Sequence, residues 1–313
     1  MPRMLLLGKD GQLGRALGRA AWLGGDRVAR GRAECDLTDE IALAAMLRDA
    51  APDIILNAAA YTAVDQAEDE PERAFAVNAA APAVLARYAA QSNAVLIHFS
   101  TDYVFDGSKS GAHEEADPTA PLGVYGETKL AGERAVAASG CRHIIVRTSW
   151  VYSAEGSNFP RTMLRLARQR PSLSVVADQW GAPTSVDLLS DVTGRFVERL
   201  RAAGAAPQAR DPLFGLYHCA AAGRTNWCDY ARYFLTCCAA AGIALTLDPA
   251  DIQAIAGEAY PTKAQRPKNS LLSSAKLEQT LALSMPDWRS GVRALAAELA
   301  NIHRANTQGT ENP

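Results

Sequence analysis

The chain has 313 residues, of which 48% are hydrophobic and 21% are charged, a composition typical of globular proteins and not of disordered or fibrous ones. Its 32 lysines and arginines are balanced by 34 aspartates and glutamates, so it lacks the overall positive charge that non-specific nucleic-acid binding requires. At roughly 100–200 residues per domain, this length suggests two domains or one large domain with an added lobe.

The lengths of the apolar runs and the numbers of cysteines and histidines disfavour a membrane span, a signal peptide, a disulfide scaffold and a metal cluster. No apolar run approaches the ~20 residues of a membrane span, and the apolar run at residues 4–7 is too short for a signal peptide. Six cysteines without a CxxC pair and five dispersed histidines supply neither a disulfide scaffold nor a metal cluster. We therefore expect a cytoplasmic protein with reduced thiols, no structural metal, and no nucleic-acid or membrane partner.

The first half alternates short apolar runs with segments of helical periodicity. Five runs are predicted to be strands: 4–7, 27–29, 53–57, 94–99 and 143–147. Four segments between them are predicted to be helices: 12–22, 40–50, 71–92 and 125–139. This alternation is typical of parallel crossovers, so we predict an α/β fold with a Rossmann-like, doubly wound parallel sheet.

The second half is less regular and predicts a smaller C-terminal α/β substrate-binding lobe. Amphipathic helix is expected at 159–170, a strand at 174–177, helix at 186–203 and a surface loop at 204–212. The predicted domains are 1–149 for a nucleotide-binding domain, with part of 183–203 packing back on it, and 150–300 mainly for the second lobe. The polar residues 301–313 are expected to form a loosely ordered tail.

The first predicted strand runs into a glycine-rich turn, Gly8-Lys-Asp-Gly11-Gln-Leu-Gly14, that opens a helix. Backbone amides at such a helix start, unobstructed by side chains at the glycines, suit a dinucleotide pyrophosphate. Glycines also occur in strand-to-helix turns for conformational reasons alone, so the motif needs support from elsewhere.

That support comes from the end of the second predicted strand, where Asp36 and Leu37 could reach an adenine or ribose. Arg30 and Arg32 lie in the same stretch, and an arginine there can pair with the 2′-phosphate of NADP, although a solvated surface arginine is an equal alternative. The residues therefore allow NADPH as well as NADH.

Tyr125 and Lys129 lie four residues apart in a predicted helix and so project from one face. A lysine ammonium beside a phenol favours the phenolate, which would make Tyr125 a usable acid or base near neutrality. The strand at 94–99 ends in Ser100-Thr101-Asp102, at the sheet edge where open α/β proteins bind ligands. The glycine turn, the strand-end hydroxyl and the YxxxK pair follow in one order across one sheet, and their conjunction is a much stronger signal than any of them alone.

The chain resembles the extended short-chain dehydrogenases/reductases and, within them, the dTDP-4-dehydrorhamnose reductase family. The resemblance runs from Met4 to about Leu299. It is carried by LLLGKDGQLG, NAAAYTAVDQAEDEPERAFAVN, STDYVFDG, YGETKLAGE, RTSWVYS, DQWGAPT and AQRPKNSLL.

The resemblance implies roles for individual residues. Catalysis is assigned to Thr101, Tyr125 and Lys129, with Lys129 also binding the nicotinamide ribose of NADPH or NADH. The family's cofactor positions match Gly8, Gly11, Gln12, Leu13, Gly14, Asp36, Leu37, Ala59, Ala60 and Tyr61, together with Tyr125 and Lys129, and Arg30 joins them on chemical grounds. Tyr61 stands where the family often has histidine. The positions matching the sugar nucleotide are Thr101, Asp102, Trp150 and Arg266.

The implied reaction is reduction of the C4 ketone of dTDP-4-dehydro-L-rhamnose to dTDP-L-rhamnose, the last step of dTDP-rhamnose biosynthesis. Lys263 and Lys268 flank Arg266 and could help neutralise the substrate diphosphate, or they could be a solvated charge cluster.

Some members of the family bind magnesium through glutamates at a dimer interface. The matching positions here are Ala16, Asp187 and Glu298, so the first ligand is missing. The residues do not support that site, and either a monomer or a homodimer is expected.

Three alternatives remain open to different degrees. A sugar-nucleotide 4,6-dehydratase needs a second carboxylate after the strand-end aspartate, where this chain has Tyr103. An epimerase, or another sugar-nucleotide ketoreductase, is harder to exclude by motif. A non-catalytic NADP-binding subunit resembling the β subunit of methionine adenosyltransferase is disfavoured because RTSWVYS and DQWGAPT keep the sugar-facing side intact.

Overall fold

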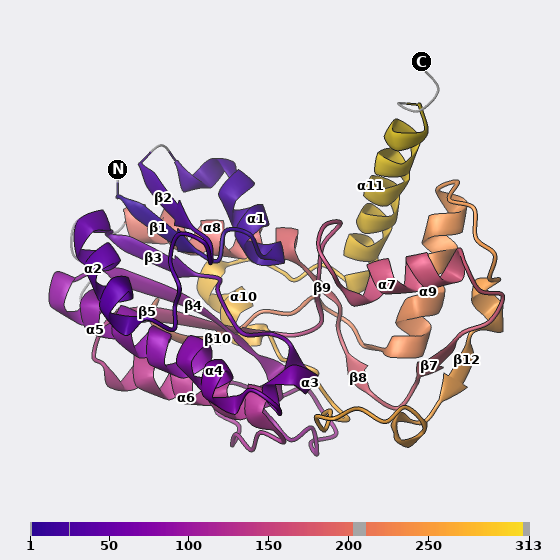
Figure 1. Ribbon diagram of the computed structural model, residues 1–313, viewed down its shortest axis with the longest axis horizontal. Helices are drawn as coiled ribbons and strands as arrows, with labels where there is room; N and C mark the ends of the chain where they lie inside the picture. Colours follow the sequence, from indigo (N-terminus) through magenta and orange to yellow (C-terminus); the bar gives the residue numbers. More distant parts are fainter. Residues whose placement is uncertain (1, 25, 203–210, 309–313) are drawn as a thin grey trace.

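The larger of the two lobes is built on a parallel sheet (Figure 1). The computed structural model describes residues 2–24, 26–202 and 211–308. Six parallel strands form the sheet in the order β10-β5-β4-β3-β1-β2. They are β1 (Met4–Leu7), β2 (Arg27–Arg30), β3 (Ile54–Asn57), β4 (Val95–Thr101), β5 (Arg142–Thr148) and β10 (Gly215–His218). The predicted doubly wound parallel sheet is confirmed.

Strand β1 is the point at which the strand order reverses, because the chain places β2 on one side of it and β3 on the other. Ligands of open α/β sheets bind at the carboxyl ends of the strands flanking such a switch point. The fold therefore predicts a binding crevice beyond Leu7 and Asn57, which are partners in the β1–β3 register.

Helices cover both faces of the sheet because successive strand residues are buried on opposite sides. Met4 and Leu6 pack in one core with α1 (Gln12–Arg19), α8 (Val186–Ala202) and α10 (Ala275–Leu281). Leu5 and Leu7 pack in a second core with α2 (Glu40–Ala50), α5 (Ala81–Ser92) and α6 (Val124–Ala138). Helix α2 begins where the sequence predicts, with the Asp39 carboxylate accepting a hydrogen bond from Ala42 N.

The predicted helical region 71–92 is interrupted. Helix α4 (Pro71–Phe75) leads into a π-helical turn (Ala76–Ala80) before α5 begins, and a short helix α3 (Val64–Ala67) precedes it. Asn78 lies in the π-helical turn and is buried. Its side chain forms hydrogen bonds with residues outside its own helix. π-turns of this kind are frequent at functional sites.

The smaller lobe packs three helices around its own core: α7 (Phe159–Ala167), α9 (Trp227–Ala240) and α11 (Trp288–Gln308). Three two-stranded ribbons complete it. They pair β6 (Val151–Tyr152) with β9 (Thr184–Ser185), β7 (Ser174–Val176) with β12 (Gln253–Ile255), and β8 (Trp180–Gly181) with β11 (Thr225–Asn226). Among the described residues, no helix is both long enough and apolar enough to cross a membrane.

The second half of the chain also contributes to the sheet lobe. Besides α8, strand β10 pairs with β5 and α10 packs beneath it, two contributions that the sequence pattern did not indicate. Tyr217 of β10 is fully buried there against Phe196 of α8. The boundary between the lobes is therefore crossed more than once by the chain.

The end of the chain differs from the expectation of a loose tail. Helix α11 continues to Gln308 and projects from the smaller lobe (Figure 1). Val292, Leu295, Ala296 and Leu299 bury one face of it and so anchor the helix. Residues 309–313, and most of the expected loop at 204–212, lie outside the described residues.

Close packing of α6 on the π-helical turn depends on Gly132, since a Cβ there would lie 2.1 Å from Asn78 O. We expect Gly132→Ala to lower the free energy of unfolding by about 1–3 kcal/mol through overpacking, despite alanine's better helix propensity. Urea denaturation measures this. Gly111→Ala, which has no atom within 4 Å of its added Cβ, is the control. Equal stability of the two variants would contradict the packing argument.

Candidate active site

A cleft of about 800 Å³ lies at the carboxyl ends of the sheet strands and extends to the smaller lobe. Most residues assigned to the site from the sequence line it. They are Gly8, Gly11, Gln12, Leu13, Arg30, Asp36, Leu37, Ala59, Ala60, Tyr61, Thr101, Asp102, Tyr125, Lys129 and Trp150. Gly14 and Arg266 do not line it.

The glycine turn is shaped by close approach of backbone to backbone. Gly8 has φ +80°, and a Cβ on it would lie 2.7 Å from Ala59 Cα. A Cβ on Gly14 would lie 1.9 Å from Gly8 O, so Gly14 allows α1 to start directly against the strand. Gly14 therefore shapes the turn and does not border the cleft.

The turn fits a pyrophosphate. Gly11 is the N-cap of α1 and offers no side chain to cap the helix start. Amide donors in the first turn of a helix attract anions when no side chain satisfies them. The residues present thus suit the diphosphate of a nicotinamide dinucleotide.

The far end of the cleft carries positive charge around Asp36. Arg30, Arg32 and Arg73 all line the cleft there. The Thr38 amide and hydroxyl each donate to Asp36 Oδ1 at 2.9 Å and hold the pKa of the Asp36 carboxyl below its usual value. Arg73 comes from α4, far from the strand in sequence, so nothing in the local pattern of the strand pointed to it.

The loop after β3 forms the opposite wall and is held by Asn78. Asn78 Oδ1 accepts from Tyr61 N at 2.9 Å, and its Nδ2 donates to Tyr61 O at 3.0 Å. The same Nδ2 donates to Thr128 Oγ1 of α6 at 3.2 Å. The Tyr61 hydroxyl donates to Glu70 Oε2 at 3.2 Å. Asn78 thus fixes the backbone of Tyr61 relative to the helix that carries Tyr125.

Thr101, Tyr125 and Lys129 converge on the cleft from β4 and α6. Burial raises the pKa of the Tyr125 phenol well above its usual value, and a hydrogen bond with Thr101 offsets part of this. Lys129 is 2% exposed and its Nζ donates to Phe99 O at 2.6 Å. Burial lowers the pKa of Lys129 to about 8, partly offset by Glu133.

The expectation that Lys129 favours a Tyr125 phenolate is therefore corrected for the structure described here. Desolvation is the largest influence on the Tyr125 pKa, and the Lys129 ammonium is directed at the backbone carbonyl of Phe99. The phenol keeps its proton at neutral pH, which is the state that a proton donor requires.

Asp102 is buried beside this group, with 2% of its surface exposed. Thr101 Oγ1 donates to its Oδ1 at 3.0 Å. Burial raises the pKa of Asp102 to about 6, and hydrogen bonds from Ser270 and Thr101 limit the rise.

Aromatic rings form the wall on the side of the smaller lobe. Trp150 has φ +50° and stacks on Trp227, with ring centroids 3.6 Å apart and planes inclined by 14°. Phe159 and Tyr230 pack against Trp227 and also line the cleft. We call Trp150, Phe159, Trp227 and Tyr230 the aromatic wall; only Trp150 was expected, because the others come from α7 and α9, which had no recognised motif.

The basic cluster expected to meet a diphosphate is engaged elsewhere. Arg266 Nη2 donates to Asp65 Oδ2 at 2.7 Å, and its guanidinium lies 5.9 Å from the Tyr103 ring. Lys263 pairs with Asp69, and Lys268 lies 3.9 Å from Glu258. The structure therefore does not bring these three cations into the cleft.

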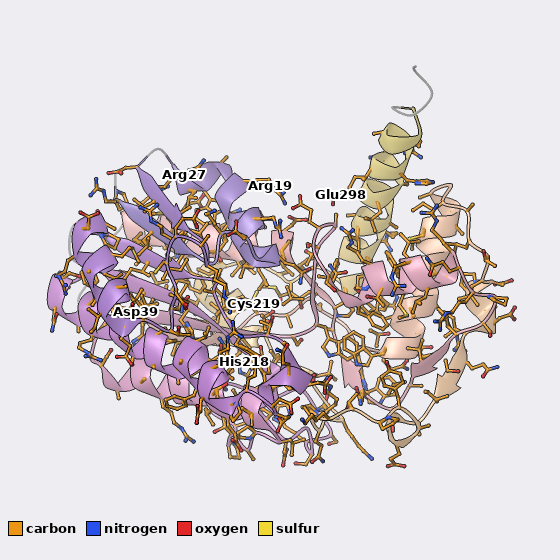
Figure 2. The ribbon with its side chains drawn as sticks, in the orientation of Figure 1. Arg19, Arg27, Asp39, His218, Cys219 and Glu298 are labelled. Atoms are coloured by element: carbon orange, nitrogen blue, oxygen red, sulfur yellow. The ribbon has the colours of Figure 1, made fainter. Side chains whose placement is uncertain are left out.

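The residues matching a magnesium site do not fit the ion. Ala16 supplies no ligand, and among the described residues no group of three or more His, Cys, Asp or Glu side chains could hold a metal. Figure 2 shows Arg19 of α1 and Glu298 of α11 on facing parts of the two lobes. Burial and Asp187 raise the pKa of Glu298, and Arg19 opposes this rise. The positive charge of Arg19 thus lies near the carboxylates of Asp187 and Glu298, where the ion would be.

Comparison with known proteins decides the family. Residues 2–301 match the family model described as the RmlD substrate binding domain. The dTDP-4-dehydrorhamnose reductase of Escherichia coli K12 is 45% identical over 300 residues, covering 95% of this chain and 97% of that protein. The chain belongs to the dTDP-4-dehydrorhamnose reductase family. The relative from Burkholderia thailandensis is 42% identical over 300 residues, covering 95% of this chain and 99% of its own.

Solved structures of the family have the same fold. A dTDP-4-dehydrorhamnose reductase from Clostridium acetobutylicum superimposes with a TM-score of 0.84 at 30% identity, covering 96% of this chain and 99% of that one. One from Bacillus anthracis, solved in complex with NADP, gives 0.82 at 31% identity and covers 95% and 99%. The family resemblance and the Rossmann-like fold expected from the sequence are thereby confirmed.

The raised pKa of Asp102 has a consequence for stability. Between its ordinary value of 3.8 and about 6, the folded protein keeps a proton that the unfolded chain releases, so the free energy of unfolding falls as pH rises through this window. We expect Asp102→Asn to remove this loss, so that the free energy of unfolding of wild type falls by about 2 kcal/mol more than that of the variant between pH 4 and 7. Urea denaturation at several pH values measures it.

The exposed Asp49 of α2 provides the control, since Asp49→Asn should leave the pH dependence as in wild type. Parallel pH profiles for wild type and Asp102→Asn would show that Asp102 titrates normally.

Proposed function

We propose that this protein reduces the C4 ketone of dTDP-4-dehydro-L-rhamnose to dTDP-L-rhamnose with NADPH or NADH, the last step of dTDP-rhamnose biosynthesis. The observation that carries the proposal is the convergence of Thr101, Tyr125 and Lys129 with the glycine turn on one cleft, in a chain 45% identical to a reductase of that name. The NADP complex of the Bacillus anthracis relative supports the cofactor.

The chain's own residues supply the proton. When bound, the reduced nicotinamide supplies the hydride. Tyr125, kept protonated by burial, donates its hydroxyl proton to the carbonyl oxygen, so that hydride and proton together reduce ketone to alcohol. Thr101 lines the cleft together with Tyr125, and we assign its hydroxyl to the carbonyl oxygen that Tyr125 protonates. The Lys129 ammonium, one helical turn beyond, stabilises the tyrosinate that remains and holds the nicotinamide ribose.

The aromatic wall and Asp102 suit the sugar. Ring faces of Trp150 and Trp227 present an apolar surface to the C–H face and methyl group of a deoxysugar. Asp102 offers a carboxyl group to sugar hydroxyls from the floor of the cleft. Arg266 becomes a substrate contact only if it leaves Asp65, so its assignment rests on the family alone.

We extend the proposal to a cytoplasmic protein acting as a monomer or a homodimer. All six cysteines are unpaired, which fits a reducing compartment. Light scattering on purified protein distinguishes the two assembly states.

The deciding experiment follows the absorbance of NADPH with the dTDP-4-keto-6-deoxy-L-sugar made in situ by the upstream dehydratase and epimerase, with NADH in parallel. Decay that needs both the sugar and this protein supports the proposal. Binding of NADPH without decay would instead favour another sugar nucleotide or a non-catalytic binding role.

Replacing Tyr125 tests the proton donor. We expect Tyr125→Phe to lower kcat about 10²- to 10⁴-fold while the Kd for NADPH stays near that of wild type. Tyr88→Phe on α5, away from the cleft, should change neither quantity. Turnover by Tyr125→Phe at the wild-type rate would remove Tyr125 from this role.

The arginines around Asp36 predict a preference for NADPH over NADH, because a 2′-phosphate placed beside Asp36 meets Arg30, Arg32 and Arg73. We expect Arg32→Ala to lower kcat/KM about tenfold with NADPH and little with NADH. Arg87→Ala, exposed on α5, is the control. Equal losses with both cofactors would place Arg32 away from the 2′-phosphate.

A further inference from the structure

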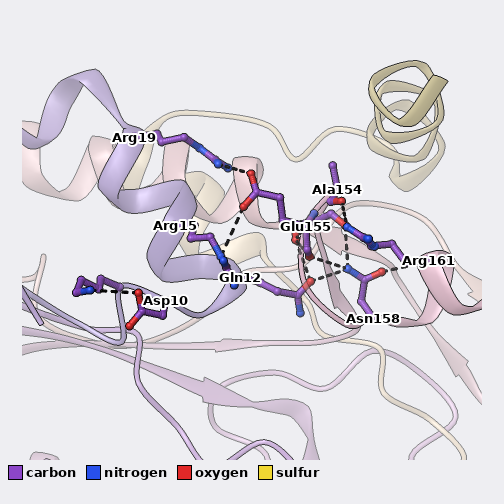
Figure 3. Close-up of polar contacts among 10 residues, drawn as sticks. Asp10, Gln12, Arg15, Arg19, Ala154, Glu155, Asn158 and Arg161 are labelled. Atoms are coloured by element: carbon purple, nitrogen blue, oxygen red, sulfur yellow. Dashed lines mark hydrogen bonds and ion pairs between the residues drawn. The ribbon is translucent and has the colours of Figure 1, made fainter. Parts of the chain in front are cut away.

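A loop of the smaller lobe reaches across to the glycine turn of the larger one. Residues 153–158, which we call the clasp, connect β6 to α7 and contact α1 (Figure 3). Asn158 Nδ2 lies 2.7 Å from Gln12 Oε1, and Ser153 Oγ lies 3.0 Å from the same oxygen. Gln12 is the first residue of α1 and lines the cleft.

The orientation of the Asn158 amide is determined by its role at the start of α7. Its Oδ1 accepts a hydrogen bond from Arg161 N at 3.1 Å and so caps the helix. Its Nδ2 must then face the other way, where it donates to Gln12 Oε1 and to Ser153 O, the latter at 2.8 Å.

The orientation of Gln12 follows from that of Asn158. Since Nδ2 of Asn158 is a donor, Gln12 turns its Oε1 toward the clasp, and its two Nε2 hydrogens are left on the opposite side of the amide. Gly156, at φ +73°, allows this approach, because a Cβ there would lie 3.3 Å from Gln12 Cγ. A glutamine turned this way presents donors and no acceptor beyond the clasp.

Ion pairs hold the clasp against α1. Glu155 Oε1 lies 2.5 Å from Arg19 Nη1, and its Oε2 lies 3.6 Å from Arg15 Nε (Figure 3). The side chains of Arg19 and Glu155 are 60% and 43% exposed, so water screens these pairs and their contribution to folding is small. Their effect is to restrict where the clasp lies.

We propose that Asn158 is a positioning residue that orients the Gln12 amide so that its N–H groups face the cofactor pyrophosphate, while Glu155 keeps the clasp on α1. The inference rests on the proposed nicotinamide cofactor and adds a residue of the smaller lobe to its binding. Cofactor affinity then depends on contact between the two lobes.

A double-mutant cycle tests whether Asn158 acts on the cofactor through Gln12. The measurement is direct binding of NADPH, followed by the fluorescence of the nicotinamide. Asn158→Ser keeps an oxygen that caps α7 but removes the donor to Gln12, and Gln12→Ala removes the amide. We expect each change to raise the Kd about fivefold and the double variant to be no weaker than Gln12→Ala alone. In both single variants the KM for NADPH should rise together with the Kd while kcat stays near the wild-type value. The Tm should move by no more than about 2 °C.

A second variant reverses the polarity of the contact. Asn158→Asp retains the cap but turns a carboxylate oxygen toward Gln12 Oε1, so we expect Gln12 to rotate and the Kd to rise more than tenfold. Glu155→Gln should raise the Kd about twofold, with the difference from wild type vanishing at high salt.

Asn226→Ser is the matched control. Asn226 caps α9 in the same lobe through Asp229 N and does not line the cleft, so this change should leave the Kd unaltered. The proposal that Asn158 acts through Gln12 would be overturned by an unchanged Kd for NADPH in Asn158→Ser. It would also be overturned if the losses of binding free energy of the two single variants added in the double variant. Failure of the wild-type protein to bind either NADPH or NADH would instead contradict the proposed function itself.

Discussion

The parallel register of the sheet is the constraint on which the site depends. Because all six strands run the same way, Leu7 lies beside Asn57 and Thr101 beside Thr148, and the segments that follow these ends emerge at one edge. The glycine turn and the Thr101 hydroxyl are thus brought together by backbone pairing before any side chain of the cleft interacts with another. The close contact of Gly14 with Gly8 O then places the start of α1 at that edge.

Burial is the second influence, and it shifts the pKa of each ionisable group in the direction of its neutral form. It keeps the Tyr125 phenol protonated, raises the pKa of Asp102 to about 6 and lowers that of Lys129 to about 8. Each neutral form is favoured because desolvation disfavours charge. The Tyr125 phenol is therefore protonated at neutral pH. Glu133, one turn after Lys129 on α6, forms a buried ion pair with Arg147, in which Arg147 Nη2 lies 2.6 Å from Glu133 Oε2.

Local patterns in the sequence were sufficient for five of the six strands of the sheet, for most of its flanking helices and for much of the cleft lining, but not for β10 and α10. Continuous apolar runs such as residues 4–7 and the YxxxK spacing depend on neighbours in the chain, and the structure bears out the elements that they predicted. Arg73, Trp227 and the pairing of Arg266 with Asp65 depend on contacts between distant segments, which no local spacing encodes. The raised pKa of Tyr125 could not be read from the YxxxK spacing, because the sequence shows which residues are neighbours but not how much water they lose.

Trp150 sits where the chain passes from β5 into the smaller lobe, in a left-handed backbone conformation that bulky residues rarely adopt. Such a conformation costs about 1–3 kcal/mol and persists only where its surroundings enforce it. Gly181 makes room for the indole, since a Cβ there would lie 2.5 Å from Trp150 Cε2. Glycine at position 150 would relieve the backbone, but it would also remove the indole that stacks on Trp227 and packs against the core of the smaller lobe. The backbone strain at this position is therefore retained together with a ring that both packs the smaller lobe and lines the cleft.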